Sequence, residues 1–369
     1  MWRTEDDLQQ MLRGSAAAWA ADAAGPETFR QFRASGRGFD PAMWAEMAAL
    51  GWTGILLPED KGGSGLGIAP ALTLAEIFGR NLVAAPFIPA AVVSGTILAR
   101  AAGEGTELAQ ALAEGQAAPL PAFRESATGL GANAPATEYR DGRLFGRKLF
   151  VPGWHEGAEL LVSAQSGGKQ LVALVQPAAA GLTTEARAMA DGTLTADLNF
   201  DGVPARPILT GPAAEEALSR AQAHEALALS AMLEGLAAQL FEMTVDYVKS
   251  RVQFDKPLAS FQVLRHALVD LHTQIELAGA SWRRAARALD EGLPSAAQRI
   301  AAARARAARA AHGMGQAAIQ YHGAFGYTEE ADVGLYVNAI LRLAAQGGSR
   351  RTHGFAALAR HKEAAHANA

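Results

Sequence analysis

The sequence predicts an α+β protein with three domains in the order helical, β and helical. Apolar residues recur at helical spacing through residues 1–117 and again from Pro212 to the C-terminus, which predicts an N-terminal helical domain and a C-terminal bundle. Residues 118–211 lack this spacing and show short β-prone runs between turn residues. The chain has 369 residues, enough for two or three domains.

The N-terminal domain, residues 1–117, is expected to hold several helices joined by a glycine-rich loop. In the segment 42–50 apolar residues follow helical spacing, and Gly51 stands where a helix C-cap is expected. Residues 58–67 include four glycines, which predict a loop. We predict further helices over 70–79 and 90–101.

The middle domain, residues 118–211, is expected to be a compact β-barrel or sandwich. Leu160–Ser163 and Leu171–Val175 are β-prone runs. Asp-Gly pairs at 141–142, 191–192 and 201–202 are typical of hairpin turns.

The C-terminal domain, residues 212–369, is expected to be a four-helix bundle with a further C-terminal helix. The predicted helices span about 213–250, 261–291, 295–320, 331–343 and 349–366. The third of these carries a run of basic residues, Arg299, Arg304, Arg306, Arg309 and His312. We interpret this run as the solvated face of an alanine-rich helix rather than as a site for an anionic partner.

Composition excludes several classes of function. The net charge of −4 gives no general attraction for nucleic acid or anionic lipid, and without cysteine there are no disulfides, thiolate metal sites or thiol nucleophiles. His312 and His322 lack companions at ligand spacing, so we expect no metal. We find no run of ~20 apolar residues, and the acidic start at Met1–Asp7 lacks the features of a secretory signal. We therefore expect a cytoplasmic protein.

The first candidate site is the stretch from Arg251 to Gln262, where one long predicted helix ends and the next begins. Pro257 breaks the helix, and Arg251 comes just before the break. An arginine near a glutamine suits a pyrophosphate, because a guanidinium forms forked, charge-assisted hydrogen bonds with phosphate oxygens. The alternative is an arginine that only interacts with the helix dipole.

The second candidate site is the stretch from Gln320 to Glu330, which follows another long predicted helix. Gly323 and Gly326 lie three residues apart and would let the backbone approach a ligand closely. The alternative is an ordinary turn between two helices.

Together the two stretches resemble the acyl-CoA dehydrogenase family. The first has the pattern Arg-x-Gln-Phe-x-x-Pro-Leu-x-x-Phe-Gln, and the second the pattern Gln-x-His-Gly-x-x-Gly-Tyr-Thr-x-Glu. Further matches fall in the family's order at 43–67 and 142–162. The resemblance covers most of the chain, and the family's architecture has the same helical, β and helical order.

The resemblance implies a protein that binds FAD and acyl-CoA. The residues that would contact FAD are Arg251, Phe254, Gln262, Gln320, Gly323, Ala324, Phe150 and Ser349. The first three would reach the pyrophosphate and adenosine of a neighbouring subunit's cofactor, while Phe150 would pack on the flavin ring. A site completed across subunits implies a homodimer, a homotetramer or a heterotetramer with a paralogous subunit.

The reaction that the resemblance implies needs a carboxylate base in a dry pocket. In many family members this glutamate begins a Glu-Gly-Thr-Ser run, but here Gln346 and Gly347 occupy that place. A glutamine amide is not a base, although these two residues could bind substrate and a backbone N–H could polarise the thioester carbonyl. Other members carry the glutamate 26 residues before the motif's arginine, which is Glu225 here. The alternative is that Glu225 is a surface glutamate.

The flavin site departs from the family's pattern at two places. The family's Thr-Glu-Pro loop falls at 123–129, where the match is poor, and Pro152 replaces a threonine that faces the flavin. Proline offers neither a hydroxyl nor an N–H. These departures are similar to those of a bacterial subgroup with short chains, which includes subunits of heteromeric dicarboxylyl-CoA and steroid side-chain-CoA dehydrogenases.

Three hypotheses follow. The first is an FAD-dependent acyl-CoA dehydrogenase that acts on a bulky or unusual acyl group, with Glu225 as base and an electron-transfer flavoprotein as electron acceptor. The second is a catalytically incomplete subunit that completes the FAD site of a related chain. The third is other chemistry on acyl-CoA thioesters, since a fold does not determine a function.

Overall fold

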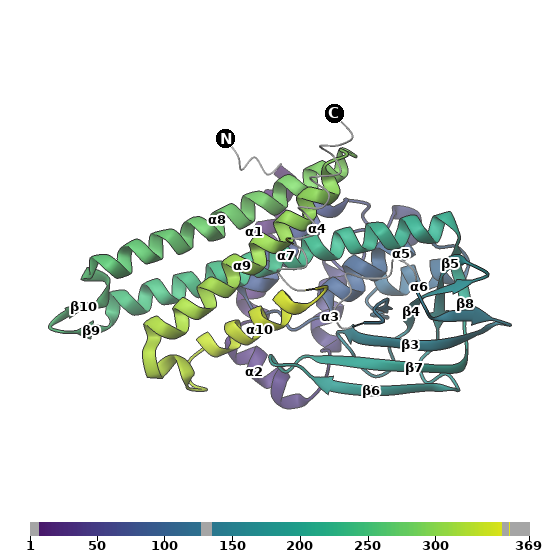
Figure 1. Cartoon of the computed structure of the whole chain (residues 1–369), viewed down its shortest axis with the longest axis horizontal. Coiled ribbons are helices and arrows are strands. Elements are labelled where there is room, and N and C mark those ends of the chain that lie inside the picture. Colours follow the sequence, from purple (N-terminus) through teal and green to yellow (C-terminus); the bar gives the residue numbers. More distant parts are fainter. Residues whose placement is uncertain (1–6, 127–134, 349–353, 355–369) are drawn as a thin grey trace. The chain divides into compact units, whose positions relative to one another are not determined.

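The computed structural model describes residues 7–126, 135–348 and 354. Its contacts divide the chain into two compact units (Figure 1). The helical unit comprises Met1–Phe29, Leu72–Val83 and Ala226–Ala369, and the sheet unit comprises Arg30–Ala71 and Ala84–Glu225. Along the chain the order is N-terminal helices, a central mixed β-sheet and C-terminal helices, which confirms the predicted fold class.

The N-terminal helices include the segments that the sequence predicted, with shifted ends. Their bounds are α1 Asp7–Ala23, α2 Pro26–Ser35, α3 Pro41–Ala49, α4 Ile68–Arg80, α5 Gly95–Leu98 and α6 Glu104–Ala113. The Asp40 carboxylate caps α3 by accepting a hydrogen bond from the Ala42 N–H at 3.0 Å. The predicted helix over 90–101 is a π-helical segment, η2 (Phe87–Ser94), that continues into α5. A short 3-10 turn, η1 (Glu59–Lys61), lies in the predicted glycine-rich loop.

The sheet unit is built around an eight-stranded mixed sheet within the described residues. The strands are β1 Leu120–Ala122, β2 Glu138–Arg140, β3 Arg143–Pro152, β4 Leu160–Ser166, β5 Lys169–Val175, β6 Leu182–Ala188, β7 Leu194–Pro204 and β8 Arg206–Thr210. Their order is β6-β7-β3-β2-β4-β5-β8, with β1 beside β4. The β1–β4 and β2–β4 pairs are parallel and the others antiparallel.

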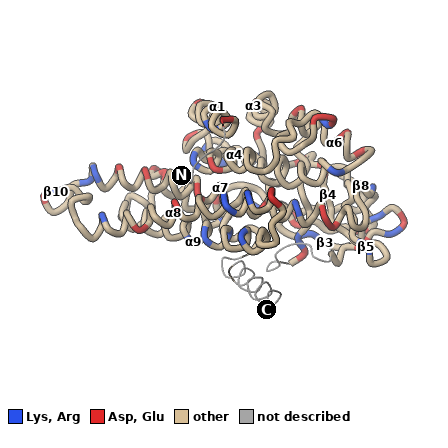
Figure 2. The backbone as a smooth tube through the Cα atoms, turned by 90° about the horizontal axis from the view of Figure 1, so that it is seen from above, with Lys and Arg blue, Asp and Glu red and all other residues tan. Residues whose placement is uncertain are grey.

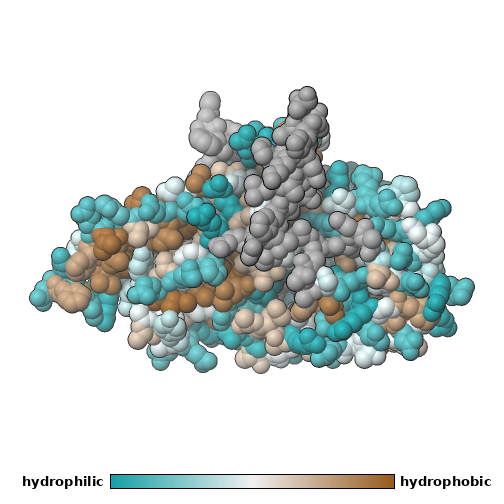
Figure 3. Space-filling model, in the orientation of Figure 1, coloured by the Kyte–Doolittle hydropathy of each residue, from teal (hydrophilic) through white to brown (hydrophobic). Residues whose placement is uncertain are grey.

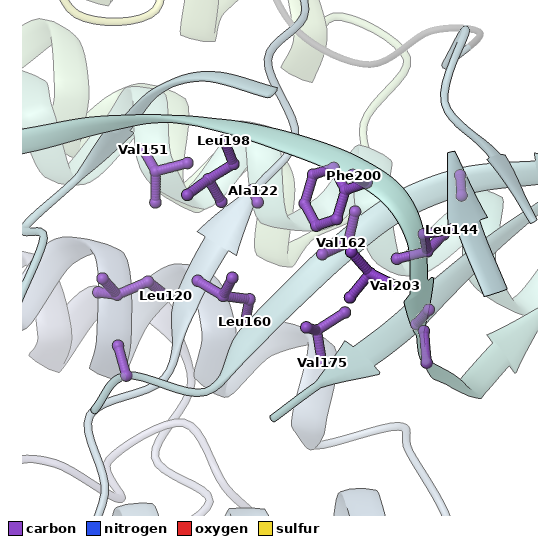
Figure 4. Close-up of a cluster of buried hydrophobic side chains, with 14 of the residues drawn as sticks. Leu120, Ala122, Leu144, Val151, Leu160, Val162, Val175, Leu198, Phe200 and Val203 are labelled. Carbon is purple, nitrogen blue, oxygen red and sulfur yellow. The ribbon is translucent and has the colours of Figure 1, made fainter. Parts of the chain in front are cut away.

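The sheet curves around a core of apolar side chains. Residues from β1, β3, β4, β5 and β7 point toward one another in this core (Figure 4), among them Leu120, Val162, Leu198 and Phe200. Each is at most 2% exposed, so the strands keep their register because a one-residue slip would turn these side chains outward.

The helical unit contains the remaining long helices. Their bounds are α7 Pro212–Ser250, α8 Gln262–Asp290, α9 Ala296–His322 and α10 Val333–Ala345. Helix α7 begins in the sheet unit and continues into the helical unit without a break. Between α7 and α8 lies a small hairpin, β9 (Val252–Gln253) and β10 (Lys256–Pro257), followed by the 3-10 turn η3 (Leu258–Ser260). The predicted helix over 349–366 lies outside the described residues except for residue 354.

Two glycines let α4 and α7 cross with their backbones almost in contact. A Cβ at Gly79 would lie 2.2 Å from the Met232 carbonyl oxygen, and one at Gly235 would lie 2.0 Å from that of Glu76. Neither glycine can be replaced without moving a helix.

Arg304 corrects our interpretation of the basic run on α9. It is 1% exposed, and its guanidinium donates to the carbonyls of Leu343 at 2.5 Å and Gln346 at 2.9 Å. The cation therefore satisfies carbonyls at the C-terminus of α10, where the helix dipole is negative. The prediction of a solvated face is wrong for Arg304, whereas Arg306 and Arg309 are exposed.

Length and composition alone would let α7 cross a membrane. However, 61% of its apolar 18-residue window is buried inside the protein, as in the core helix of a soluble protein. Acidic and basic positions are interspersed along both units (Figure 2).

Candidate functional site

A cavity in the sheet unit brings together residues that lie far apart in the sequence. It is partly open to solvent, and its empty space of about 440 Å³ includes solvent at its mouth. Its lining consists of Val93, Pro121, Phe123, Arg124, Leu149, Phe150, Pro152, Gln222 and Glu225. The structure thus places the predicted base, Glu225, in the same cavity as Phe150, and it adds a cation, Arg124, that the sequence did not single out.

A β-bulge presents Phe150 to this cavity. Lys148 pairs with Leu198 and Val151 with Ala196, so β3 carries one residue more than β7 over this step. Phe150 has φ +53°, in the left-handed region that costs a non-glycine residue roughly 1–3 kcal/mol. Its N–H donates to Asp197 Oδ1 at 2.9 Å, which replaces the ladder hydrogen bond lost at the bulge.

A second hydrogen bond ties the facing loop to the bulge. The Leu149 N–H donates to the Arg124 carbonyl at 2.7 Å. Because Leu149 and Arg124 both line the cavity, this bond fixes the two lining segments against each other.

The first turns of α7, which carry Gln222 and Glu225, are anchored to α5 by a buried hydrogen bond. His224 Nδ1 lies 2.8 Å from Thr96 Oγ1, whose hydroxyl donates to the Val92 carbonyl at 2.6 Å. Since the hydroxyl hydrogen is used, His224 Nδ1 must carry the proton and donate. Burial, with a smaller contribution from Arg220, lowers the pKa of His224 to about 4, so the ring is neutral at pH 7.

The tip of the helical unit carries the first predicted motif. Phe254 and Asp255 form the two-residue turn of the β9–β10 hairpin with φ values of +55° and +60°. Arg251 and Gln262 are exposed at the base of this hairpin, and Phe254 is 80% exposed. Glycine or asparagine would suit this turn better than these two residues. Strained backbone at exposed residues is typical of a functional site.

Tyr247, which the sequence did not single out, brings the second motif to this tip. It lies one turn before Arg251 on α7, and its ring stacks on His322 with centroids 4.3 Å apart. Its ring also lies parallel to that of Phe325 at 6.3 Å, and its hydroxyl donates to the His322 carbonyl at 3.3 Å. The turn η4 (Gly323–Tyr327) is thereby held near the end of α7. Gln320, Gly323 and Ala324 are exposed there.

Gln346 and Gly347 form the C-terminal turn of α10. The Gln346 carbonyl accepts from Arg304, and its side-chain oxygen accepts from Arg342 at 3.3 Å. Gly347 has φ +75°, as expected for a helix C-terminus. Ser349, the remaining predicted cofactor contact, lies outside the described residues.

Comparisons with known proteins agree with the motifs. Residues 6–109 match the N-terminal domain of acyl-CoA dehydrogenases, and residues 216–354 match their C-terminal domain. The acyl-CoA dehydrogenase IpdE2 of Mycobacterium tuberculosis is 30% identical over 342 residues, which cover 90% of this chain and 91% of IpdE2. The chain belongs to the acyl-CoA dehydrogenase family.

Two solved structures share the fold of this chain. A variant of the steroid ACAD Tcur3481-Tcur3483 superimposes with a TM-score of 0.89 at 27% identity, over 97% of this chain and 99% of that one. The ChsE4-ChsE5 complex of M. tuberculosis has the same fold, with a TM-score of 0.85 at 22% identity over 95% and 96% of the two chains. These homologues form complexes of two different subunits.

The family uses FAD, and the tip residues have the chemistry to hold it. Arg251, Gln262 and Gln320 offer exposed donors suited to phosphate oxygens. Phe254 and Tyr327, which are 80% and 78% exposed, offer apolar faces on which an adenine ring can stack. In the sheet unit, Phe150 offers a ring for the flavin.

Proposed function

We propose that this acyl-CoA dehydrogenase family enzyme removes two hydrogens across the α,β bond of a bulky acyl-CoA thioester, with Glu225 as the base. The observation that carries the proposal is that Glu225 lines the same cavity as Phe150 and Leu149. Gln346, which stands where many relatives have the base, has no basic atom. FAD, when bound, accepts the hydride.

The residues of the cavity have different roles in this reaction. Glu225 takes the proton from the carbon next to the thioester carbonyl. Val93, Leu149 and Pro152 give this carboxylate apolar neighbours and limit the access of water. Arg124 adds a positive charge to the same cavity, which favours the negative charge that develops on the substrate as the proton leaves.

The names of the relatives support an inference about the substrate class. Because one structural relative is a steroid ACAD, we infer a steroid-derived or similarly bulky acyl group. We further infer that the protein works in the cytoplasm and passes electrons to an electron-transfer flavoprotein. The contacts of Arg251, Phe254 and Gln262 would then be made with the FAD of a neighbouring subunit.

The test is the substitution Glu225→Gln in the FAD-loaded protein, mixed with acyl-CoA under anaerobic conditions. Loss of the base should slow flavin bleaching by about 10²–10⁴-fold while acyl-CoA still binds. Glu215→Gln, an exposed glutamate in the first turn of α7, is the matched control and should bleach at the normal rate. Full activity of Glu225→Gln would show that another group is the base.

A second candidate function is that of a partner subunit that completes the FAD site of a related chain. Gln346 and Pro152 favour it, as do the two-subunit assemblies of the homologues. Expression alone and together with a paralogous chain separates the two. A yellow homo-oligomer that acyl-CoA bleaches supports the function of an enzyme. A colourless protein that binds FAD only in the hetero-oligomer supports the function of a partner subunit.

A further inference from the structure

An ion pair in the sheet unit joins a buried lysine to a partly exposed glutamate next to the cavity lining. The Lys148 side chain is 0% exposed, and its Nζ donates to Glu125 Oε1 at 2.6 Å and to Ser163 Oγ at 3.0 Å. Lys148 is the residue before Leu149 on β3, and Glu125 is the residue after Arg124. Each member of the pair is therefore the chain neighbour of a residue that lines the cavity.

Glu125 also binds the two residues just before β2. Its Oε1 accepts from the Thr137 hydroxyl at 2.7 Å and from the Thr137 N–H at 3.0 Å. Its Oε2 accepts from the Ala136 N–H at 2.6 Å. One carboxylate thus joins three places in the chain: the cavity loop at 123–125, the start of β2 and the bulged strand β3.

The pair lies at one end of a continuous set of restraints on the cavity. Lys148 is bound to Glu125, Leu149 to the Arg124 carbonyl, and Phe150 to Asp197, so three successive residues of β3 are each fixed by a separate hydrogen bond. Phe123 and Arg124 on one side, and Leu149 and Phe150 on the other, are consequently held at a set separation.

The stability of the fold does not by itself account for this pair. Burial lowers the pKa of Lys148 to about 8, although the hydrogen bond and charge of Glu125 oppose the shift. Burial acts to raise the pKa of Glu125, but the charge and hydrogen bonds of Lys148, with those of Thr137 and Ala136, hold it below its usual value. Buried ion pairs can often be replaced by apolar residues of similar volume without loss of stability. Because burying this lysine costs free energy, we interpret the pair as a means of holding the two chain segments in a fixed position.

We propose that Lys148 and Glu125 are positioning residues, which hold the Phe123–Arg124 loop against the Leu149–Phe150 bulge and so set the shape of the cavity in which flavin and acyl group meet. This rests on the proposed function for the identity of the ligands. The two residues touch neither the substrate nor the reacting atoms, and they act through the four lining residues beside them.

The first test is Glu125→Gln in the FAD-loaded protein, because glutamine keeps the shape and can still accept from Thr137 while the charge is lost. We expect FAD to bind about tenfold more weakly, as for a weakened hydrogen bond to a charged group. We also expect a shifted visible band of the flavin and a kcat that falls more than KM changes. The matched control is Glu185→Gln, whose ion pair with Arg187 is exposed in the same unit, and it should leave all three unchanged.

The second test separates position from stability. In the double variant Glu125→Gln, Lys148→Met no charge is left in the pair and the glutamine still accepts from Thr137, so the unfolding midpoint should stay close to that of the parent protein. The flavin band and kcat should remain altered, because the loop is no longer tied to Lys148 of β3. If the flavin band and kcat equal the parent values when the unfolding midpoint does, the pair is merely structural and the proposal is wrong.

Thr137→Val covers the case in which the double variant does not fold. It removes the hydroxyl donor to Glu125 but keeps both charges, and should give a smaller shift of the flavin band in the same direction as Glu125→Gln. An unchanged band would contradict the proposal. FAD affinity and the flavin band can be measured without turnover. Full activity of Glu225→Gln would therefore rule out Glu225 as the base but would not contradict this inference.

Discussion

The cavity of the sheet unit and the hairpin tip of the helical unit hold most of the predicted site residues, and they are built in opposite ways. In the cavity Leu149 and Phe150 are half-buried, and hydrogen bonds from within the same unit fix their backbone. At the tip Phe254 and Tyr327 are 80% and 78% exposed. Exposed hydrophobic surface also lies over the helices near this tip on the face shown in Figure 3.

The difference indicates when each region acquires its working geometry. The backbone of the cavity wall is organised before any ligand arrives, because hydrogen bonds within the chain hold Leu149 and Phe150. On the proposed function, the tip gains most of its contacts when a cofactor or another subunit covers it, since exposed large apolar side chains next to donors mark an interaction surface. Substitutions at the tip should therefore change binding and leave stability intact, whereas substitutions that leave a donor of the cavity wall without its acceptor should change both.

Arg251→Ala should give the largest effect and tests the tip. Removing a forked, charge-assisted contact to a phosphate costs up to about 3 kcal/mol, so the FAD dissociation constant should rise about 100-fold. The unfolding midpoint of the FAD-free protein should not change, because Arg251 is exposed. Titration of FAD by fluorescence and thermal unfolding measure the two quantities.

The control for the tip is Lys249→Ala, which removes an exposed cation two residues earlier. It should leave FAD affinity almost unchanged. A similar loss of affinity in both variants would mean that the tip attracts FAD only by general charge, and the assignment of Arg251 would be wrong.

Asp197→Ala tests the cavity and should cost about 2 kcal/mol of unfolding free energy. It leaves the Phe150 N–H without its acceptor at a strained backbone position, and an unmet buried donor costs about 1–3 kcal/mol. Flavin absorbance should change as well, because Phe150 loses its fixed orientation. Urea denaturation gives the first quantity and the visible spectrum the second. Arg187→Ala, which removes an exposed ion-pair partner of Asp197 and of Glu185, should change neither.

The regular parts of the fold could be predicted because they follow local patterns. Helical spacing located α7, α8 and α9 to within a few residues, and turn residues located the strands of the sheet. For these elements the information lies in the spacing of residues along the chain. Glu225 was instead chosen by resemblance to relatives that carry a glutamate 26 residues before the motif's arginine, and it lies in the lining of the cavity.

The supporting contacts could not be predicted, because they join elements that are distant in the sequence. Nothing in the neighbourhood of Arg304 distinguishes it from the exposed Arg306, and only the packing of α9 against α10 decides which is buried. The Lys148–Glu125 pair and the bulge at Phe150 likewise depend on strand register. Tyr247 likewise gave no signal, because the residue it stacks on, His322, lies 75 positions further along the chain.

The crossing of α4 and α7 differs from both the cavity and the tip, because it buries Glu234, an acid with no predicted role in binding. Glu76 accepts from Arg13 at 3.0 and 2.9 Å and from Arg283 at 2.8 Å. Glu234 is 7% exposed, and within the described residues its Oε2 has no hydrogen-bond partner. Burial, and then the charge of Glu76, raise the pKa of Glu234 to about 8, against the opposing charges of Arg283, Arg80 and Arg13.

Glu234→Gln should therefore flatten the dependence of stability on pH. The native state holds this proton more tightly than the unfolded state, so the contribution of Glu234 to stability is greatest below about pH 4.5 and is lost as pH rises toward about 8. The slope from one such group is at most about 1.4 kcal/mol per pH unit. Chemical denaturation at several pH values measures it. Glu242→Gln, an exposed partner of Arg80, should keep the parent slope, and an unchanged slope in Glu234→Gln would show that this acid is already ionised in the native state.

Thr96→Val should give the smallest effect and tests how far the support of the cavity extends. The substitution keeps the volume but removes the acceptor of the His224 Nδ1–H, which should cost about 1 kcal/mol in urea denaturation. Thr96→Ser retains the hydroxyl and should cost much less. Because His224 precedes Glu225 on α7, a further drop in kcat for Thr96→Val at constant KM would show that this bond also orients the carboxylate. A Thr96→Val variant with the stability and kcat of the parent protein would contradict this role of the bond, and the cavity would then depend on the hydrogen bonds of its own wall alone.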